Sequence, residues 1–248
     1  DWPAPAHVHA CVSTRIGGSS AAPWASLNLA LHVGDDPAAV LRNRAALVSA
    51  LGLPAEPDWL DQVHGCAVVD ACADGLVRTG DAAYAARPGV VCAVMTAACL
   101  PVLLTNRAGT EVAAVQCGWR GLAAGILARS CARFASPTRD LLAWLGPAIS
   151  QRAFEVGPEV RAAFLDPQPD PAARAAVAAA FEPAPVGKFR ADLYALARLQ
   201  LAGLGVSRVY GGGLCTFGSP DLFYSYRRDG ITGRMASLIW ISHGPASA

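Results

Sequence analysis

The stretch that most constrains the fold is an apolar run over residues 89–121, GVVCAVMTAACLPVLLTNRAGTEVAAVQCGWRG. Pro101 interrupts the run before it reaches the roughly 20 apolar residues that a bilayer-spanning helix needs, so a membrane helix is not predicted. Its bias toward Val and Ala, the break at residues 99–101 and the turn signal at residues 106–109 predict two or three buried strands instead. The chain is therefore expected to be built around a buried sheet.

The last of these predicted strands, residues 111–115, runs into the sequence QCGWRG, which is followed by a helix predicted over residues 122–134. The two glycines of QCGWRG permit a tight corner between the strand and the helix. Cys99 and the pair Gln116 and Cys117 come at the ends of predicted strands. Reactive groups are commonly displayed where a rigid sheet meets its loops, so we expect a site at this edge.

Composition narrows the class of protein. A chain of 248 residues, 53% of them apolar, can bury the core of one large domain or two small ones. The net charge of +1, with no run of Lys or Arg, gives nucleic acid no support as a partner. Eight cysteines without a C-x-x-C pair, in a sequence that does not open on a signal segment, predict reduced thiols and a cytoplasmic location.

Signals for helices and strands are mixed irregularly along the rest of the chain, without an internal repeat, which predicts one mixed α/β domain. Strands are predicted over residues 7–13, 59–65, 67–70, 141–145, 206–214 and 235–241, and helices over residues 37–51, 158–165, 171–181 and 192–204. In the first helix, which Asp36 caps, Asn43 and Arg44 are expected to lie away from the apolar face made by Val40, Leu41, Leu47, Val48 and Leu51.

Two isolated candidates precede the apolar run. Arg15 lies in the loop TRIGGSS, where backbone N–H groups and a guanidinium could bind a phosphate or carboxylate, although an ordinary turn has the same composition. His64 ends a predicted strand before a glycine. A single histidine is more often a hydrogen-bonded structural residue than a ligand, so both alternatives stay open.

Taken together, the motifs TRIGGSS, NLALHVGDD, QVHG, CLP, GWRG, GPAIS with FEVG, ADL, SYRRDG and TGRMAS resemble those of the YfiH-like laccase-domain family, in one order and over almost the whole chain. The resemblance implies a single domain over residues 1–248, folded as a four-layer α/β/β/α sandwich with mixed sheets. Members of this family are described as multicopper polyphenol oxidases, and as purine nucleoside phosphorylases that act on adenosine, inosine or methylthioadenosine and also have adenosine deaminase activity.

The resemblance also implies a zinc or copper site made by a histidine of QVHG, the cysteine of a T-A-D-C-L-P motif and a histidine of H-A-G-W-R-G. His64 and Cys99 match the first two, but Gln116 stands where the family has its second histidine, and Ala98 stands where it has aspartate. Glutamine is a poorer ligand for zinc or copper than imidazole, so the metal is expected to be weakly bound or absent. Cys117 could substitute only if the corner twists, because neighbours on a strand point to opposite faces.

The resemblance implies that this chain is a purine nucleoside phosphorylase that also deaminates adenosine, that it binds a purine nucleoside and phosphate, and that Ala98 and Gln116 impair it. The catalytic candidates are His64, Cys99 and Arg120, and the substrate-binding candidates are Arg15, Asn28, Arg227 and Arg228. For each arginine the alternative is a surface ion pair, which contributes little energy. Two other functions remain open. Copper-dependent phenol oxidation is disfavoured, because several copper ions need many histidines and this chain has five. Four of them, His7, His9, His32 and His243, do not match the site. A purine-binding protein that has lost catalysis is favoured by Ala98 and Gln116.

Overall fold

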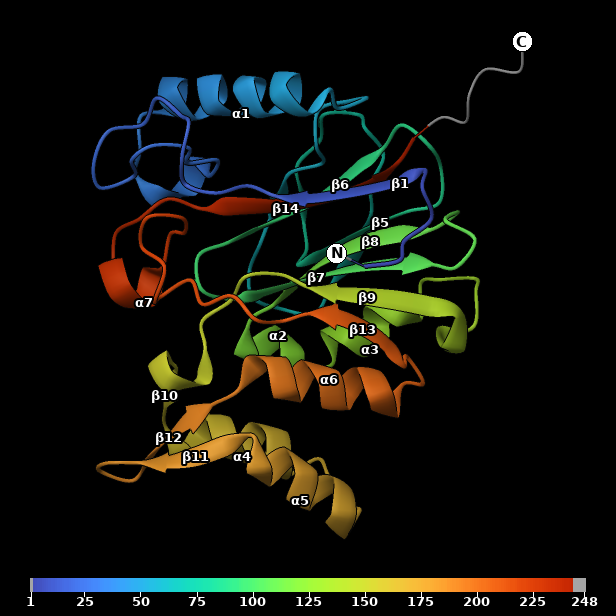
Figure 1. Cartoon of the computed structure of the whole chain (residues 1–248), viewed down its shortest axis with the longest axis vertical. Coiled ribbons are helices and arrows are strands. Elements are labelled where there is room, and N and C mark those ends of the chain that lie inside the picture. The colour runs from blue at the N-terminus through green and yellow to red at the C-terminus, as the bar shows by residue number, and fades with distance from the viewer. Residues whose placement is uncertain (1, 243–248) are drawn as a thin grey trace.

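Two β-sheets lie face to face at the centre of the computed structural model, which describes residues 2–242 (Figure 1). His243, which was not matched to the site, lies outside the described residues. The smaller central sheet has three antiparallel strands in the order β1 (Val8–Val12), β14 (Met235–Ile241) and β6 (Val91–Thr96). The helix α1 (Pro37–Leu51) covers its outer face, where Leu47 packs with residues of β6 and β14.

The larger sheet is mixed. Its six strands are, in order, β13 (Arg208–Gly211), β9 (Leu141–Leu145), β7 (Leu100–Asn106), β8 (Val112–Cys117), β5 (Ala82–Ala85) and β3 (Val68–Asp70). The edge pairs β13 with β9 and β3 with β5 are parallel, and the other neighbours are antiparallel. The two or three buried strands predicted from the apolar run are thus β6 in the smaller sheet and β7 and β8 in the larger one.

Side chains alternate between two cores along these strands. On β8, Val112 and Ala114 face the smaller sheet, whereas Ala113 and Val115 face the helices on the other side. Those helices are α2 (Trp119–Ala123), α3 (Ile126–Cys131) and α6 (Leu193–Gly203). The resulting order, helix, sheet, sheet and helices, confirms the predicted mixed α/β fold with four layers (Figure 1).

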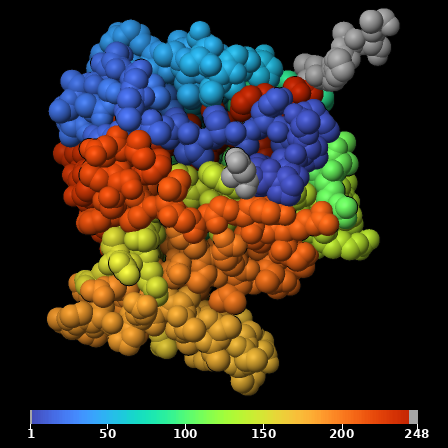
Figure 2. Space-filling model, viewed as in Figure 1, coloured from blue at the N-terminus to red at the C-terminus, as the bar shows by residue number. Residues whose placement is uncertain are grey.

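A second, smaller group of elements forms one end of the molecule, coloured gold in Figure 2. It contains the helices α4 (Pro158–Leu165) and α5 (Pro171–Ala179) and the three-stranded sheet of β10 (Glu155–Val156), β12 (Lys188–Ala191) and β11 (Phe181–Ala184). The remaining short elements are β2 (Leu60–Asp61), β4 (Arg78–Thr79), α7 (Tyr226–Asp229) and the 3-10 helices η1 (Leu31–Val33), η2 (Thr138–Asp140) and η3 (Gln151–Ala153). Among the described residues, no helix combines the length and apolar character needed to cross a membrane.

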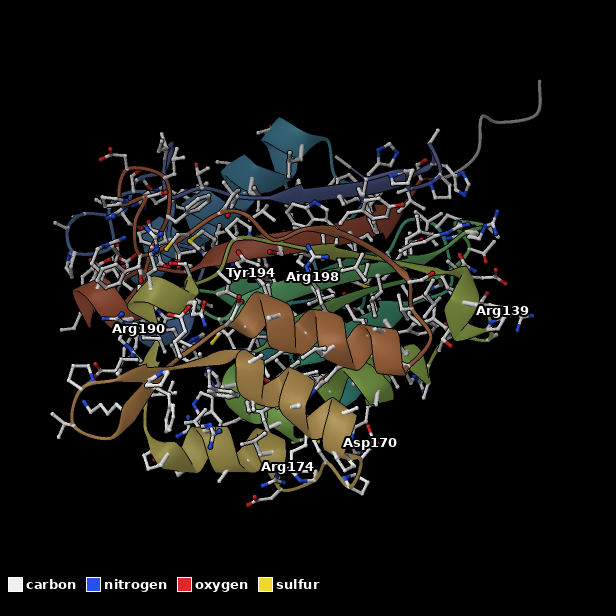
Figure 3. All side chains as sticks on the ribbon, turned by 60° about the horizontal axis from the view of Figure 1, so that its bottom comes forward. Arg139, Asp170, Arg174, Arg190, Tyr194 and Arg198 are labelled. Carbon is white, nitrogen blue, oxygen red and sulfur yellow. The ribbon has the colours of Figure 1, made fainter. Side chains whose placement is uncertain are left out.

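The side chains of α6 attach it to the large sheet. The Tyr194 hydroxyl accepts a hydrogen bond from the Ala148 N–H at 2.8 Å and lies 2.7 Å from the Leu214 carbonyl, while Arg198 donates to the carbonyls of Val209 and Gly211. Figure 3 shows both labelled side chains on α6. These bonds fix the loop over residues 146–150, which contributes Ile149 to the pocket described below.

The prediction for the buried face of α1 is wrong in part. Asn43 and Arg44 are buried, whereas Leu41 is 56% exposed. The Asn43 amide bonds the Ser19 N–H and the carbonyls of Ser26 and Asn28, and Arg44 donates to the Leu29 carbonyl. The polar pair therefore holds the loop over residues 13–34, whose backbone groups need partners that an apolar face could not supply.

Other element boundaries also differ from the prediction. The helix predicted over residues 122–134 begins earlier, at Trp119, and is divided by Gly125, whose φ of 84° leaves the helical region. The helix predicted over residues 171–181 ends at Ala179, because Phe181 starts β11. The strands predicted over residues 59–65 and 206–214 shorten to β2 and β13.

Candidate active site

A cavity of about 670 Å³ opens where β6 and β8 end and β7 begins. Its wall is completed by residues 62–64, by the start of α2, by Ile149 and Phe154, and by Tyr226, Arg227 and Arg234. Elements that are far apart in the sequence thus meet at one edge of the two central sheets. This is the edge at which the sequence predicts reactive side chains.

Three side chains of different elements converge beside Gly118. A methyl group on the Gly118 Cα would lie 3.0 Å from Gln116 Nε2, 3.1 Å from Cys99 Sγ and 3.3 Å from His64 Cδ2. Cys99 comes from the turn between β6 and β7, Gln116 from the end of β8, and His64 from the segment after β2. A larger residue at position 118 would press on all three side chains, so glycine leaves the space that they share unobstructed.

Backbone geometry aims His64 and Cys99 into this space. His64 has a φ of 59°, in the left-handed region, and its N–H donates to Asp81 Oδ1 at 2.8 Å while the Gly65 N–H donates to Asp81 Oδ2 at 2.7 Å. Ala98, with a φ of 109°, forces the turn before Cys99. Non-glycine residues with such angles are strained and cluster at functional sites. The buried Asp81, which nothing in the sequence singled out, thus orients His64.

The Cys99 thiol is largely enclosed, and burial raises its pKa to about 11. The nearby Arg234 charge and a hydrogen bond from the Gln116 side chain act in the opposite direction. A second histidine, His32 of η1, stands at the mouth of the cavity, where partial burial and the charge of Arg234 lower its pKa. The sequence did not match His32 to the metal site of the family, but the structure places it in the wall of the same cavity.

Three arginines reach the same cavity. Arg120 stacks on Trp119, Arg227 lies over Phe154 at 5.1 Å, and Arg234 lies near the ring of Tyr226. Within residues 2–242 none of these guanidinium groups forms an ion pair with a carboxylate, and the cavity wall contains no Asp or Glu. Unneutralised cations around an enclosed space attract an anionic ligand.

Arg234 is the most enclosed of the three. Its Nη1 donates to the Thr232 and Gly233 carbonyls, and burial lowers its pKa. This residue was not among the sequence-based candidates, although it belongs to the quoted motif TGRMAS just before the last strand. An arginine directly after a glycine at a strand end is the signal that could have found it.

Comparison with known proteins identifies the family. Residues 9–242 match the family described as multi-copper polyphenol oxidoreductase laccase. The chain belongs to this laccase family. It is 54% identical to a purine nucleoside phosphorylase of Pseudomonas aeruginosa over 97% of this chain and 96% of that protein. It is 52% identical to the purine nucleoside phosphorylase YfiH of Escherichia coli, with the same coverage. The crystal structure of a Neisseria meningitidis protein superposes with a TM-score of 0.91 at 51% identity, covering 98% of both chains.

Not every substrate-binding residue predicted from the sequence lies in the cavity wall. Arg15 donates to the carbonyls of Ala25 and Pro220. The fully buried Asn28 bonds Asp35, and Arg228 donates to the carbonyls of Thr216, Phe217 and Phe223. Arg15, Asn28 and Arg228 lie outside the cavity wall. They hold the loops around the cavity, which corrects their assignment to the substrate.

Cys117 does not replace the missing imidazole. It is fully buried with the apolar side chains on the helix side of β8, and burial raises its pKa well above the ordinary value. The chain after β8 does not twist enough to turn the Cys117 side chain toward the cavity. Of the neighbours Gln116 and Cys117, only Gln116 lines the cavity. The assignment of Cys117 as a substitute ligand is therefore corrected.

The residues present do not fit the three-ligand metal centre that the laccase family implies. Within residues 2–242, no group of three or more His, Cys, Asp or Glu side chains is arranged to hold a metal ion. His64 and Cys99 are two suitable donors, but the third position is an amide that faces the thiol. Catalytic zinc sites normally use three protein ligands, and an amide oxygen suits harder ions than zinc or copper.

Proposed function

We propose that the protein is a phosphorylase that cleaves purine nucleosides such as adenosine, inosine or methylthioadenosine. The observation that carries the proposal is the set of unneutralised arginines at a cavity that also holds His64, Cys99 and an aromatic wall. The arginines suit phosphate, and the rings of Trp119, Phe154 and Tyr226 suit a flat base. The names of the Pseudomonas and Escherichia relatives support the same chemistry.

In the proposed reaction, a phosphate oxygen, C1′ of the ribose and the purine nitrogen lie in one line. A phosphate oxygen bonds to C1′ of the ribose, the bond from C1′ to the purine nitrogen breaks, and its electron pair passes to the base, which takes up a proton. Arg120, Arg227 and Arg234 are proposed to bind the phosphate. His64, oriented through Asp81, is proposed to supply the proton, because imidazole transfers protons efficiently near neutral pH. Base and ribose 1-phosphate then leave.

Two positions of this chain are proposed to slow the reaction. Ala98 replaces a carboxylate that could orient a ligand or exchange a proton, and Gln116 replaces an imidazole. The Ala98→Asp, Gln116→His double variant is therefore expected to release base faster than the unmodified chain. A protein that binds nucleosides without cleaving them is the second candidate function, and the same two residues favour it.

The experiment that tests the proposal measures base and ribose 1-phosphate formed from adenosine, inosine and methylthioadenosine with and without phosphate. Phosphate-dependent release of base that His64→Ala abolishes is the expected result, and Cys99→Ala tests the second candidate side chain of the cavity wall. Cys92→Ala is the control, because Cys92 is fully buried and packs between the two sheets, away from the cavity. Nucleoside binding without any base release, also in the double variant, would favour the second candidate.

A further inference from the structure

The floor of the cavity is polar where the core between the two sheets ends. On β6, Cys92 and Val94 point into this core, and Thr96 is the next residue on the same side of the strand. On β8, Val112 and Ala114 point into the same core, and Gln116 is the next residue on that side of the strand. Both strands therefore replace an apolar residue with a polar one at the position that borders the cavity, and both Thr96 and Gln116 line it.

Within the described part of the chain, one polar atom of each of these two side chains lacks a hydrogen-bond partner. Thr96 is 3% exposed and Gln116 is 1% exposed, yet Thr96 Oγ1 and Gln116 Oε1 have no hydrogen-bond partner there. Leaving a buried polar atom without a partner costs about 1–3 kcal/mol, and native proteins rarely tolerate it without reason. Two such atoms, one on a strand of each facing sheet, meet at one cavity floor and indicate that a bound molecule supplies their partners.

The chemistry of these atoms defines the partner. Because the Gln116 side chain bonds Cys99 through its amide, its Oε1 is left to accept a hydrogen bond. The Thr96 hydroxyl can both donate and accept. A sugar hydroxyl can donate and accept too, whereas the flat face of a purine needs the apolar and aromatic wall made by Ile149, Phe154 and Tyr226.

We propose that Thr96 and Gln116 bind the ribose hydroxyl groups of the nucleoside and so select ribonucleosides over 2′-deoxynucleosides. The inference rests on the proposed function, which supplies the nucleoside. It also places the sugar beside Cys99 and His64, with the base against the aromatic wall and the phosphate at the arginines. A site built to bond a hydroxyl discriminates against an analogue that lacks it, because its buried polar groups then stay unpaired.

The test measures binding, so that it does not depend on turnover. The dissociation constants of adenosine and 2′-deoxyadenosine are determined by calorimetry for the unmodified protein and for Thr96→Val, which removes the hydroxyl at nearly constant volume. We expect the unmodified protein to bind adenosine about three- to tenfold more tightly, as one net hydrogen bond predicts, and Thr96→Val to lose most of this preference. Thr96→Ser, which retains the hydroxyl, should restore it.

Ser237→Ala is the matched control. Ser237 lies on β14 beside β6, is fully buried, and also has an unpartnered hydroxyl within the described residues, but it does not line the cavity. Its removal should leave the preference for adenosine unchanged. Equal binding of the two nucleosides by the unmodified protein, or an unchanged preference in a folded Thr96→Val protein, would overturn this inference alone. Failure of both nucleosides to bind would overturn the proposed function as well.

Discussion

At the scale of single residues, we propose that Gln116 decides whether the cavity can hold a metal ion. Its side chain shares the space beside Gly118 with His64 and Cys99, so an imidazole at this position would add a third donor. We predict that Gln116→His raises bound zinc from well below one ion per chain to about one, because three protein ligands and one open position make a catalytic zinc site. The zinc content of purified, dialysed protein measures this.

The control for the zinc prediction is Cys117→Ser. Cys117 belongs to the core on the helix side of β8, so its replacement should change zinc content in neither background. Stoichiometric zinc in the unmodified protein would show that another group completes the site and that Gln116 is not a lost ligand.

Arg234 carries a second prediction at this scale. Replacing it with glutamine removes an enclosed charge that no carboxylate of residues 2–242 neutralises. The KM for phosphate should rise about ten- to hundredfold, since a hydrogen bond to a charged group contributes about 1.5–3 kcal/mol, while adenosine binding changes little. Arg129→Gln is the control, because Arg129 is exposed on α3. An unchanged KM for phosphate in Arg234→Gln would assign the anion to other residues.

The residue scale also shows what motifs can and cannot locate. The sequence pointed to His64 and Cys99 because each belongs to a quoted motif at the end of a predicted strand, and both line the cavity. Arg227 and Arg228 are neighbours in one motif, yet only Arg227 lines the cavity while Arg228 bonds backbone carbonyls. Which of two consecutive side chains faces a cavity depends on how a short helix docks, and that contact involves segments distant in the sequence.

At the scale of elements, the apolar run predicted β6, β7 and β8 because buried strands leave a strong local pattern. The hairpin of β11 and β12 was missed for the opposite reason. Phe181 continues the apolar pattern of α5, but it pairs with Ala191 of β12, and this pairing depends on contacts outside the segment. The polar buried face of α1 was missed because its partners lie in a preceding loop.

The turn between β7 and β8 carries a prediction about pH. Glu111 accepts hydrogen bonds from Tyr84, Asn106, the Ser136 hydroxyl and the N–H groups of Ala135 and Ser136. Burial alone would raise its pKa, but these bonds lower it below the ordinary value. The stabilisation that they give is therefore complete above the unfolded-state pKa of about 4.3 and is lost as the pH falls through the lower folded-state pKa.

Glu111→Gln should thus lower the free energy of unfolding by about 2 kcal/mol at pH 7, as expected for buried bonds to a charged group, and by less as the pH falls below about 4. Urea unfolding of both proteins between pH 3 and pH 7 measures the difference. Glu182→Gln, at an exposed position of β11, serves as control. A difference that stays constant over this range would show that Glu111 acts through shape and not through its charge.

At the scale of the whole molecule, the strands β7 and β8 belong to two cores at once. Leu103 points between the sheets, whereas Val102 and Leu104 point toward the helices. If one core unfolds, the faces of β7 and β8 that it covers become exposed to solvent, although the opposite faces of the same strands form the other core. We therefore propose that the chain unfolds as one domain, and we predict coincident urea transitions by tryptophan fluorescence and far-UV circular dichroism.

Leu103→Ala makes this last prediction specific. Leu103 is fully buried between the sheets, so its truncation should cost about 2–5 kcal/mol. If the layers form one cooperative unit, the midpoints reported by both probes fall together and the slope of the transition stays the same. Leu41→Ala, on the exposed side of α1, should shift neither midpoint appreciably. Two separate transitions, or a shift seen by only one probe, would show that the group of α4, α5 and β12 unfolds on its own and that the single-domain proposal is wrong.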